Sequence, residues 1–406
     1  MTMRYTFFVR FIWLILVASL PISAGVSGKE RQLVLWYEKF EAESAFTKLG
    51  QQFQAETGIT LVVQHMPTGD LKASSIRAVG EGVAPDIIFA PSDFIGNRAI
   101  LKLSEIAEPF SQPIIKGATS SVTDGGKQYG VPLLYGNHLM LYFNKSLVAE
   151  SANSWAGLIA QREIVEGKGV NLIAWKPMEM YWVIPFLTAF GGVPVDDNGI
   201  QLGSPEIAKG LEYYRQQTEL GAINMRCSYE CVYEKFIAGE YAYAINGDWA
   251  FNQLKQKLGQ DFGVAMLPKV DGARMRSMSS SITLMFPGDA LNGHRKSDID
   301  SFVRFMLTAD AQRVMYQETG MMPTTTQAYS EIKQSFKDDP DMAVFFAQME
   351  HTIPMPPSPE MSAAWIGMAK GVALYMRGKA TGEQAVEFMQ THAERELRRQ
   401  SETQKQ

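Results

Sequence analysis

The chain has 406 residues, of which 46% are hydrophobic and 20% are charged, a balance typical of globular proteins. Its formal net charge is −5, and such an acidic chain is a poor match for nucleic acid. We therefore expect no nucleic-acid partner.

The first 24 residues have the layout of a cleavable secretory signal. They carry Arg4 and Arg10 but no acidic residue, and an apolar run at 11–20 is followed by small residues at 23–25. This run is too short to span a bilayer, and no cysteine for lipid attachment lies near it. We predict a periplasmic protein without a lipid anchor. About 380 residues remain after processing, more than one hydrophobic core usually serves, so two lobes are expected.

Strand-like and helix-like patterns alternate from residue 32 onward. In chain order they predict a strand at 32–38, a helix at 41–57, a strand at 59–65, a helix through 76 and 79, and a strand at 86–90. Phe46, Leu49 and Phe53 share one face of the first helix, and Gly58 ends it. Ser92 or Asp93 opens a further helix. This alternation predicts an α/β fold with a largely parallel sheet.

The region 130–144 interrupts this alternation. Two strand-like runs, at 131–135 and 139–143, flank Gly136-Asn137, and we expect the chain to cross between the lobes here. A short crossing of this kind is a candidate hinge. A second alternation follows, with strands at 171–175 and 241–245 and helices near 180–190, 205–220 and 229–238.

A return segment at 281–286 and helices near 299–307 and 310–318 are expected to rejoin the first lobe. The proline-rich stretch 353–359 leads into a final helical region. Both lobes are therefore predicted to be discontinuous in sequence. We expect an N-terminal lobe of residues 25–135 and 280–330, a C-terminal lobe of residues 136–279 and 331–395, and a polar tail at 396–406.

The two cysteines, Cys227 and Cys231, are four residues apart. In an oxidising compartment this pair favours a local disulfide, although a regular helix would strain it, and two reduced thiols on one helical face are the alternative. No metal site is expected, because the five histidines are scattered and metal sites need convergent donors. The segment Asp-Asp-Asn-Gly at 196–199 lacks the further ligands of a calcium loop and predicts a tight turn.

Signatures of catalysis are scarce in this sequence. It contains no Gly-x-Ser-x-Gly, His-Glu-x-x-His or phosphate-binding Gly-Lys-Ser/Thr motif. Acidic and aromatic residues instead recur where predicted elements end, namely Glu38, Asp93, Glu179, Tyr181, Asp248, Trp249 and Trp365. Carboxylates orient sugar hydroxyls and aromatic faces cover the apolar faces of sugar rings, so this combination suits a carbohydrate-binding cleft. For Asp248 and Trp249, a helix cap and a core tryptophan are the alternative interpretation.

An ordered series of short segments runs through nearly the whole mature chain. It comprises Leu-Val-Leu-Trp at 33–36, Leu-Gly-Gln-Gln-Phe at 49–53, Glu-Thr-Gly-Ile at 56–59, Ala-Pro-Asp-Ile-Ile-Phe at 84–89, Gly-Val-Pro at 130–132, Leu-Tyr-Phe-Asn-Lys at 141–145, Gly-Gly at 191–192, Ile-Asn-Gly at 245–247 and Pro-Glu-Met-Ser-Ala at 359–363. Together with Trp249 and Trp365, this series resembles the bacterial extracellular solute-binding proteins of the maltose-binding type. The resemblance implies a two-lobed periplasmic-binding fold. It also implies a substrate-capture subunit of an ATP-driven importer, which closes over its ligand and docks on a membrane permease.

The resemblance also implies a set of ligand contacts. Asp93 matches a family acid that bonds sugar hydroxyls, Glu179 and Tyr181 match an acid and a ring of the second lobe, and Trp249 and Trp365 match sugar-stacking indoles. Other positions depart from the maltose-binding pattern. That family has a tryptophan where this chain has Ala90, an arginine where it has Phe94, and an Asp-Lys pair where it has Phe40-Glu41. A family glutamate aligns with Asn137 and a late family arginine aligns with Ala369. These changes argue against maltose itself, since an unpaired buried polar group costs about 1–3 kcal/mol. Replacement contacts are expected among Glu38, Lys39, Glu41, Asn137, His138 and Asp248.

We therefore predict a two-lobed α/β protein, like the type II periplasmic-binding proteins, that binds a di- or oligosaccharide between its lobes and delivers it to the permease of an ABC importer. It is expected to be monomeric, to need no cofactor and to perform no chemistry on the sugar. Two alternatives stay open at this point. One is a sensory binding protein read by a membrane receptor or kinase, and the other is an exported glycosidase that uses two of these carboxylates.

Overall fold

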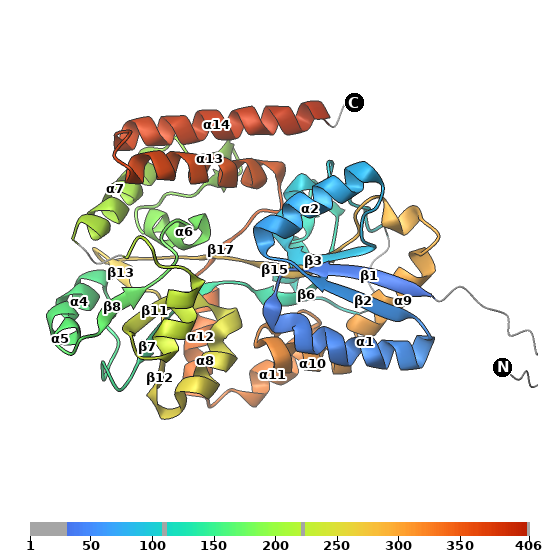
Figure 1. Ribbon diagram of the computed structural model, residues 1–406, viewed down its shortest axis with the longest axis horizontal. Coiled ribbons are helices and arrows are strands. Elements are labelled where there is room, and N and C mark those ends of the chain that lie inside the picture. Colours follow the sequence, from blue (N-terminus) through green and yellow to red (C-terminus); the bar gives the residue numbers. More distant parts are fainter. Residues whose placement is uncertain (1–30, 108–111, 221–223, 404–406) are drawn as a thin grey trace, which may run out of the picture.

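The computed structural model describes residues 31–107, 112–220 and 224–403, so the predicted signal at 1–24 lies outside the described residues. Two α/β lobes, each built on its own main sheet, lie side by side in Figure 1. Helices α13 (Pro359–Met376) and α14 (Gly382–Thr403) run along the top of that view. The predicted two-lobed α/β class is confirmed. Among the described helices, none combines the length and apolar character needed to cross a membrane.

The larger sheet has the strand order β16-β6-β15-β3-β1-β2, and β17 pairs with β15. Its strands are β1 (Gln32–Tyr37), β2 (Thr60–His65), β3 (Ile87–Pro91), β6 (Val131–Gly136), β15 (Met278–Met285), β16 (Met322–Pro323) and β17 (Ile353–Pro354). Strand β1 is parallel to β2 and β3, whereas β15 is antiparallel to β3 and β6. The sheet is mixed rather than largely parallel, because the return strand β15 enters it in the opposite direction.

The smaller sheet has the strand order β12-β7-β11-β8. Its strands are β7 (Leu139–Asn144), β8 (Asn171–Ala174), β11 (Tyr241–Gly247) and β12 (Phe262–Ala265). Strands β8 and β11 are parallel and β7 is antiparallel to β11. Three two-stranded hairpins complete the described strands: β4 (Thr123–Asp124) with β5 (Lys127–Gln128), β9 (Val195–Asp196) with β10 (Gly199–Ile200), and β13 (Lys269–Val270) with β14 (Ala273–Arg274). The β9–β10 hairpin confirms the tight turn predicted at 196–199.

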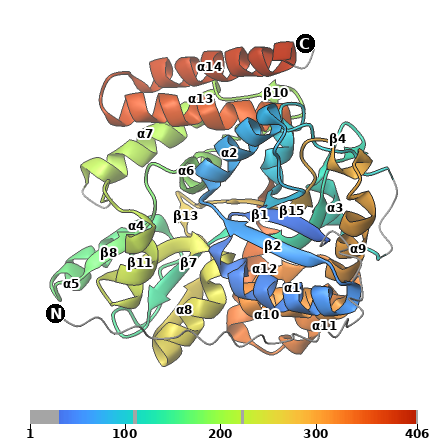
Figure 2. The same ribbon diagram turned by 45° about the vertical axis from the view of Figure 1, so that its right-hand side comes forward.

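Helices cover both faces of the larger sheet, with α2 (Thr68–Glu81) on one side and α1 (Glu43–Thr57) on the other (Figures 1 and 2). The remaining α-helices are α3 (Lys116–Ser120), α4 (Trp155–Ala160), α5 (Arg162–Glu166), α6 (Met180–Thr188), α7 (Pro205–Glu219), α8 (Phe251–Leu258), α9 (Lys296–Met306), α10 (Ala309–Thr319), α11 (Thr326–Ser335) and α12 (Pro340–Glu350). Helix α1 (Glu43–Thr57) buries Phe46, Leu49 and Phe53, and Gly58 ends it with a φ of 71°. Its amphipathic pattern is therefore confirmed residue by residue. Helix α2 spans Thr68–Glu81.

The chain passes from one sheet to the other where the sequence predicts a crossing. Strand β6 of the larger sheet is followed directly by β7 of the smaller sheet, with Asn137 and His138 between them. The Asn137 side chain donates a hydrogen bond to Ser280 Oγ at 2.9 Å, which ties this crossing to the return strand. Gly136 has a φ of 124°, and a Cβ there would lie 2.1 Å from Asp248 Oδ2, so the position requires glycine. Its action as a hinge stays a prediction.

The cysteine pair of the C-terminal lobe differs from the sequence-based picture. Cys227 and Cys231 are both buried and their thiols are free, so the predicted disulfide is absent. Cys227 lies in the coil before the helical run that starts at Tyr229, and Cys231 begins the π-helix η3 (Cys231–Lys235). The two side chains interact through a thiol hydrogen bond in place of a covalent bond. At the other end, α14 continues to Thr403, so most of the predicted polar tail is helical.

Candidate functional site

The carboxyl ends of β1 and β3 meet at one edge of the larger sheet, because the two strands are parallel and pair Tyr37 with Phe89. Acidic residues follow both strands. The Glu38 backbone N–H donates to the Phe89 carbonyl at 3.3 Å, and Asp93 lies in the 3-10 helix η2 (Ser92–Asn97). Parallel strands present the residues after their carboxyl ends to a common crevice. The first lobe therefore offers an acidic edge.

Lys39 and Glu41 extend this edge around the start of the short 3-10 helix η1 (Phe40–Ala42). Lys39 Nζ lies 3.4 Å from Glu38 Oε1, and both side chains are largely shielded from solvent. Burial raises the pKa of Glu41, while the nearby Lys39 charge acts in the opposite direction. The protein thus holds a carboxyl group where its charged form has lost much of its water.

Asp93 is held in a similar way. Its side chain is 13% exposed, and Lys72 Nζ from α2 lies 3.8 Å from Asp93 Oδ2. Burial raises the pKa of Asp93, and both Lys72 and a hydrogen bond from the Trp365 side chain oppose that rise. Lys72 also lies over the Phe94 ring, 4.6 Å from its centroid. The Asp93 carboxylate can accept hydrogen bonds from a polar ligand that replaces the lost water.

The second lobe presents aromatic rings at the corresponding edge of the smaller sheet. The carboxyl ends of the parallel strands β8 and β11 lie together there, and they are followed by α6 and by the 3-10 helix η4 (Asp248–Ala250). Trp182 of α6 donates its indole N–H to the Ile245 carbonyl at 2.8 Å, which fixes α6 to β11. The Trp182 and Trp249 rings meet edge to face, 6.1 Å apart.

Trp249 is positioned by contacts on several sides and is only 6% exposed. Its indole N–H donates to the Tyr229 hydroxyl at 3.0 Å. A Cβ on Gly247 would lie 2.1 Å from the indole ring, so the glycine lets the ring pack directly against the end of β11. The Asn-Gly that ends the strand is therefore a packing requirement of the tryptophan that follows it.

Tyr181 connects this aromatic edge to the crossings between the lobes. Its hydroxyl donates to the Met278 carbonyl at 3.0 Å and also contacts the Asn137 carbonyl. Burial raises the pKa of Tyr181 well above its ordinary value. Its ring lies 6.3 Å from that of Trp365 in α13, and Trp365 in turn bonds Asp93 of the first lobe. These contacts form a continuous path from one lobe to the other.

The two edges touch directly at a second place. Lys39 Nζ lies 4.1 Å from the centroid of the Trp249 ring, a cation–π contact between the lobes. The charge of Glu41 also reaches Tyr229, whose pKa is raised first by burial and then by this carboxylate. The described structure is thus a closed arrangement in which acids and lysines of one lobe face rings of the other.

His138 and Asp248 lie in the interior, next to the contact between the lobes. Both side chains are fully buried, with His138 Nδ1 3.2 Å from Asp248 Oδ2, and the Asp248 N–H donates to the His138 carbonyl at 2.9 Å. Phe345 packs edge to face against the imidazole ring. Helix α8 has no side-chain cap, so Asp248 does not take the capping role that the sequence offered as an alternative. The pair joins the crossing to the residue beside Trp249 and is fully shielded from solvent.

Glu179 lies apart from the other predicted contacts. Its side chain is 49% exposed and pairs with Lys176 at 3.3 Å. Lys176 in turn lies 5.1 Å from the Trp182 ring centroid. The structure therefore brings together Asp93, Tyr181, Trp249 and Trp365 with Glu38, Lys39, Glu41 and Asn137, but leaves Glu179 at the surface. No group of three or more metal-binding side chains occurs within the described ranges.

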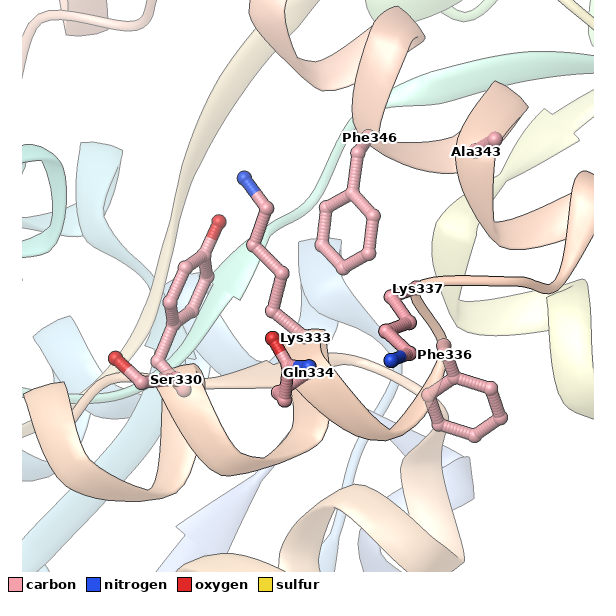
Figure 3. A pocket seen from close by; sticks show the side chains of 8 residues that line it. Ser330, Lys333, Gln334, Phe336, Lys337, Ala343 and Phe346 are labelled. Carbon is pink, nitrogen blue, oxygen red and sulfur yellow. The ribbon is translucent and has the colours of Figure 1, made fainter.

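A surface pocket of about 440 Å³ lies elsewhere, between α11 and α12 (Figure 3). It is lined by Tyr329, Ser330, Lys333, Gln334, Phe336, Lys337, Ala343 and Phe346. Lys333 Nζ lies 5.0 Å from the Phe346 ring centroid. None of the predicted ligand contacts lines this pocket, so its volume alone does not identify the functional site.

Comparison with known proteins decides the family. Residues 48–344 match the family described as bacterial extracellular solute-binding protein. The chain belongs to this family. It is also 26% identical to a maltotriose-binding protein of Pyrococcus abyssi (strain GE5 / Orsay) over 361 residues, which cover 84% of this chain and 76% of that protein.

Two further relatives come from Streptococcus pneumoniae, strains R6 and TIGR4. Each is called a maltooligosaccharide ABC transporter solute-binding lipoprotein. Each is 24% identical to this chain over 370 residues, covering 86% of this chain and 84% of the relative. The predicted family resemblance is confirmed, and the related proteins are named for binding rather than for catalysis.

In this solute-binding protein, several residues that contact the predicted site could not be identified from the sequence. Lys72 and Trp182 were missed because their partners, Asp93 and Trp249, are distant in sequence. Tyr229 and Tyr233 stack with their ring centroids 6.1 Å apart and their planes within 6°. Their spacing of four residues on a predicted helix was the available signal, since such residues share one helical face.

Proposed function

We propose that this solute-binding protein binds an oligosaccharide of the maltodextrin type between its lobes and presents it to the permease of an ABC importer. The observation that carries the proposal is that acids of one lobe face rings of the other where the two lobes meet. Asp93 belongs to the first lobe, and Tyr181 and Trp249 belong to the second. Acids can bond the ring hydroxyls while indoles cover the apolar sugar faces. The names of the relatives support the choice of glucose oligomers.

The proposal assigns parts to the residues predicted from the sequence. Asp93, Tyr181, Trp249 and Trp365 contact the sugar directly, and Glu38 and Glu41 accept further hydroxyls. Glu179, half exposed beside Lys176, is assigned to the outer sugar units. His138 and Asp248 support the site from beneath.

The proposal includes a closing motion about the crossings near 136–138 and 280. The moving lobes are those predicted from the sequence, 25–135 with 280–330 and 136–279 with 331–395. A sugar that bridges the lobes favours the closed state only by the additional contacts that it makes in that state.

We also propose export by the segment 1–24, release without a lipid anchor, and action as a monomer. Fractionation of cells that express the full chain tests export and release, and recovery in the membrane fraction would contradict the absence of an anchor.

Calorimetry and thermal unfolding with a sugar panel test the binding function. The panel contains maltose, maltotriose and maltotetraose, with cellobiose as a linkage control. A ligand at one hundred times its Kd adds about 2.7 kcal/mol to the free energy of unfolding, so Tm rises with sugar concentration. Chromatography of the incubated sugar should recover it unchanged, and appearance of shorter products would instead support the glycosidase. The Asp93→Asn variant should bind more weakly, while Asp300→Asn, which alters a surface pair with Lys296, should bind normally. Absence of stabilisation by every sugar in the panel would refute the proposal.

Gene deletion separates import from sensing. Loss of growth on the bound sugar supports delivery to a permease. Normal uptake with loss of a transcriptional or chemotactic response would instead indicate a sensory partner.

A further inference from the structure

The Lys39 side chain reaches from the first lobe onto the sugar-binding indole of the second. It leaves the main chain between β1 and η1, and its ammonium lies 4.1 Å from the centroid of the Trp249 ring. Only 12% of the Lys39 side chain and 6% of Trp249 are exposed. The contact is therefore largely shielded from water, the condition in which a cation–π contact is strongest.

This contact takes the place that the proposed sugar needs. A ring stacked on an indole lies about 3.5–4 Å from it, the ordinary van der Waals separation between carbon atoms. The ammonium already occupies that distance, Gly247 packs against the indole atoms, and the Trp182 ring meets Trp249 edge to face. So little of the indole is accessible that a sugar cannot stack on it until Lys39 moves away.

Lys39 has a second partner that it can keep after moving. Glu38 Oε1 lies 3.4 Å from Nζ and belongs to the same lobe. Glu41 of that lobe also interacts electrostatically with Lys39. The ammonium can therefore leave Trp249 without becoming an unpaired buried charge, which would be a large penalty. The local chemistry supports two positions of one side chain, on the indole or withdrawn to the acids.

We propose that Lys39 is a latch between the lobes, which holds the sugar-free protein closed and must be displaced from Trp249 before a sugar can stack there. This inference rests on the proposed function for its sugar-binding half. Its other half, the bridge between the lobes, stands on the contact itself. Lys39 thereby sets the affinity for sugar as a competitor, in contrast to a residue that binds the sugar.

The test replaces Lys39 with methionine, which keeps an unbranched apolar stem and removes the charge. Two quantities are measured: the radius of gyration of the sugar-free protein by small-angle X-ray scattering, and the Kd for maltotriose by calorimetry. The control is Lys333→Met, because Lys333 makes the same kind of contact with Phe346 in the remote pocket of Figure 3. This control should change neither quantity.

The latch predicts that Lys39→Met increases the sugar-free radius of gyration and tightens maltotriose binding about tenfold, which corresponds to about 1.4 kcal/mol. Weaker binding by Lys39→Met would overturn the proposal and make Lys39 a sugar contact. An unchanged radius together with an unchanged Kd would also overturn it. If neither protein binds any sugar but the variant is more open, the latch is supported and the proposed sugar function fails.

Discussion

Replacement of Trp249 tests the core of the proposed site, and its two effects can be worked out from the structure. Trp249→Ala removes an edge-to-face pair with Trp182, worth about 0.5–1.5 kcal/mol. It removes a hydrogen bond to Tyr229, worth about 0.5–1.5 kcal/mol, and the contact with Lys39, worth about 0.5–2 kcal/mol. The free energy of unfolding should therefore fall by about 1.5–5 kcal/mol. This range overlaps the cost of about 3–5 kcal/mol that is typical for truncating a buried tryptophan.

The effect of Trp249→Ala on binding is estimated separately. A tenfold loss of affinity equals about 1.4 kcal/mol, which corresponds to about 55 Å² of apolar surface at about 25 cal/mol per Å². A tryptophan offers about 150–250 Å² in total, so a sugar that covers roughly a third of it, on the face that Lys39 now occupies, reaches this threshold. We expect maltotriose affinity to fall by more than tenfold. Trp249→Phe, which keeps an aromatic face but cannot donate to Tyr229, should give an intermediate loss.

Trp155 provides the matched control for this experiment. It is a core tryptophan of the second lobe, and it donates its indole N–H to Gln217 at 2.8 Å and packs edge to face on Trp175. Trp155→Phe should lower Tm and leave the calorimetric Kd unchanged. The decisive result is the Kd of a folded Trp249→Ala protein. If that Kd equals the wild-type value, Trp249 is a structural residue and the proposed stacking is wrong.

Three further outcomes are expected. Burial raises the pKa of Asp93, so the folded protein binds the carboxyl proton of Asp93 more tightly than the unfolded chain does. The contribution of Asp93 to the free energy of unfolding therefore declines as pH rises from the ordinary pKa of 3.8 through the raised pKa. Asp93→Asn should therefore gain Tm relative to wild type as pH rises through this window, although it binds sugar more weakly; a Tm difference that is independent of pH would contradict the burial argument. His138→Ala removes the imidazole partner of the fully buried Asp248 and should cost about 3–5 kcal/mol in chemical denaturation, whereas full stability would show that the pair is dispensable. Thiol titration of the protein denatured without reductant should detect two free thiols, those of Cys227 and Cys231. Detection of no free thiol would show that the two cysteines form a disulfide.

The sequence was sufficient to predict the edges of the two sheets. Hydrophobic runs fixed where β1, β3 and β11 end, and parallel pairing then brings the residues after those ends together. Asp93, Tyr181, Trp249 and Trp365 were predicted in this way, and the family resemblance then matched each of them to a ligand contact. These four residues needed only local pattern and the order of elements along the chain.

The contacts between those edges could not be predicted from local pattern. Lys39 and Trp249 are 210 positions apart, and only the relative placement of the lobes brings the ammonium to the indole. Asp248 shows the same limit, since a helix cap is the local expectation for an acid at that position and the pairing with His138 is a tertiary contact. The prediction for the cysteine pair was wrong for a different reason: spacing and compartment favoured a disulfide, whereas the structure holds the two thiols in a hydrogen bond with both sulfurs free.

The shared feature of Glu41, Asp93 and Tyr181 is that burial is the main cause of each raised pKa. These polar groups lie where the lobes meet, so closing the cleft removes water that they would otherwise bind. Sugar hydroxyls can replace that water only in the closed state, and this gives the ligand the differential affinity that closure requires. Shifting the populations from 1:99 to 99:1 needs about 5.5 kcal/mol of such preference. If Lys39 holds part of the sugar-free population closed, its contact with Trp249 must be broken before a sugar can stack there, so the energy of that contact is subtracted from the sugar's binding energy. Lys39 should therefore lower the affinity of this protein for sugar, and removal of its charge should raise it.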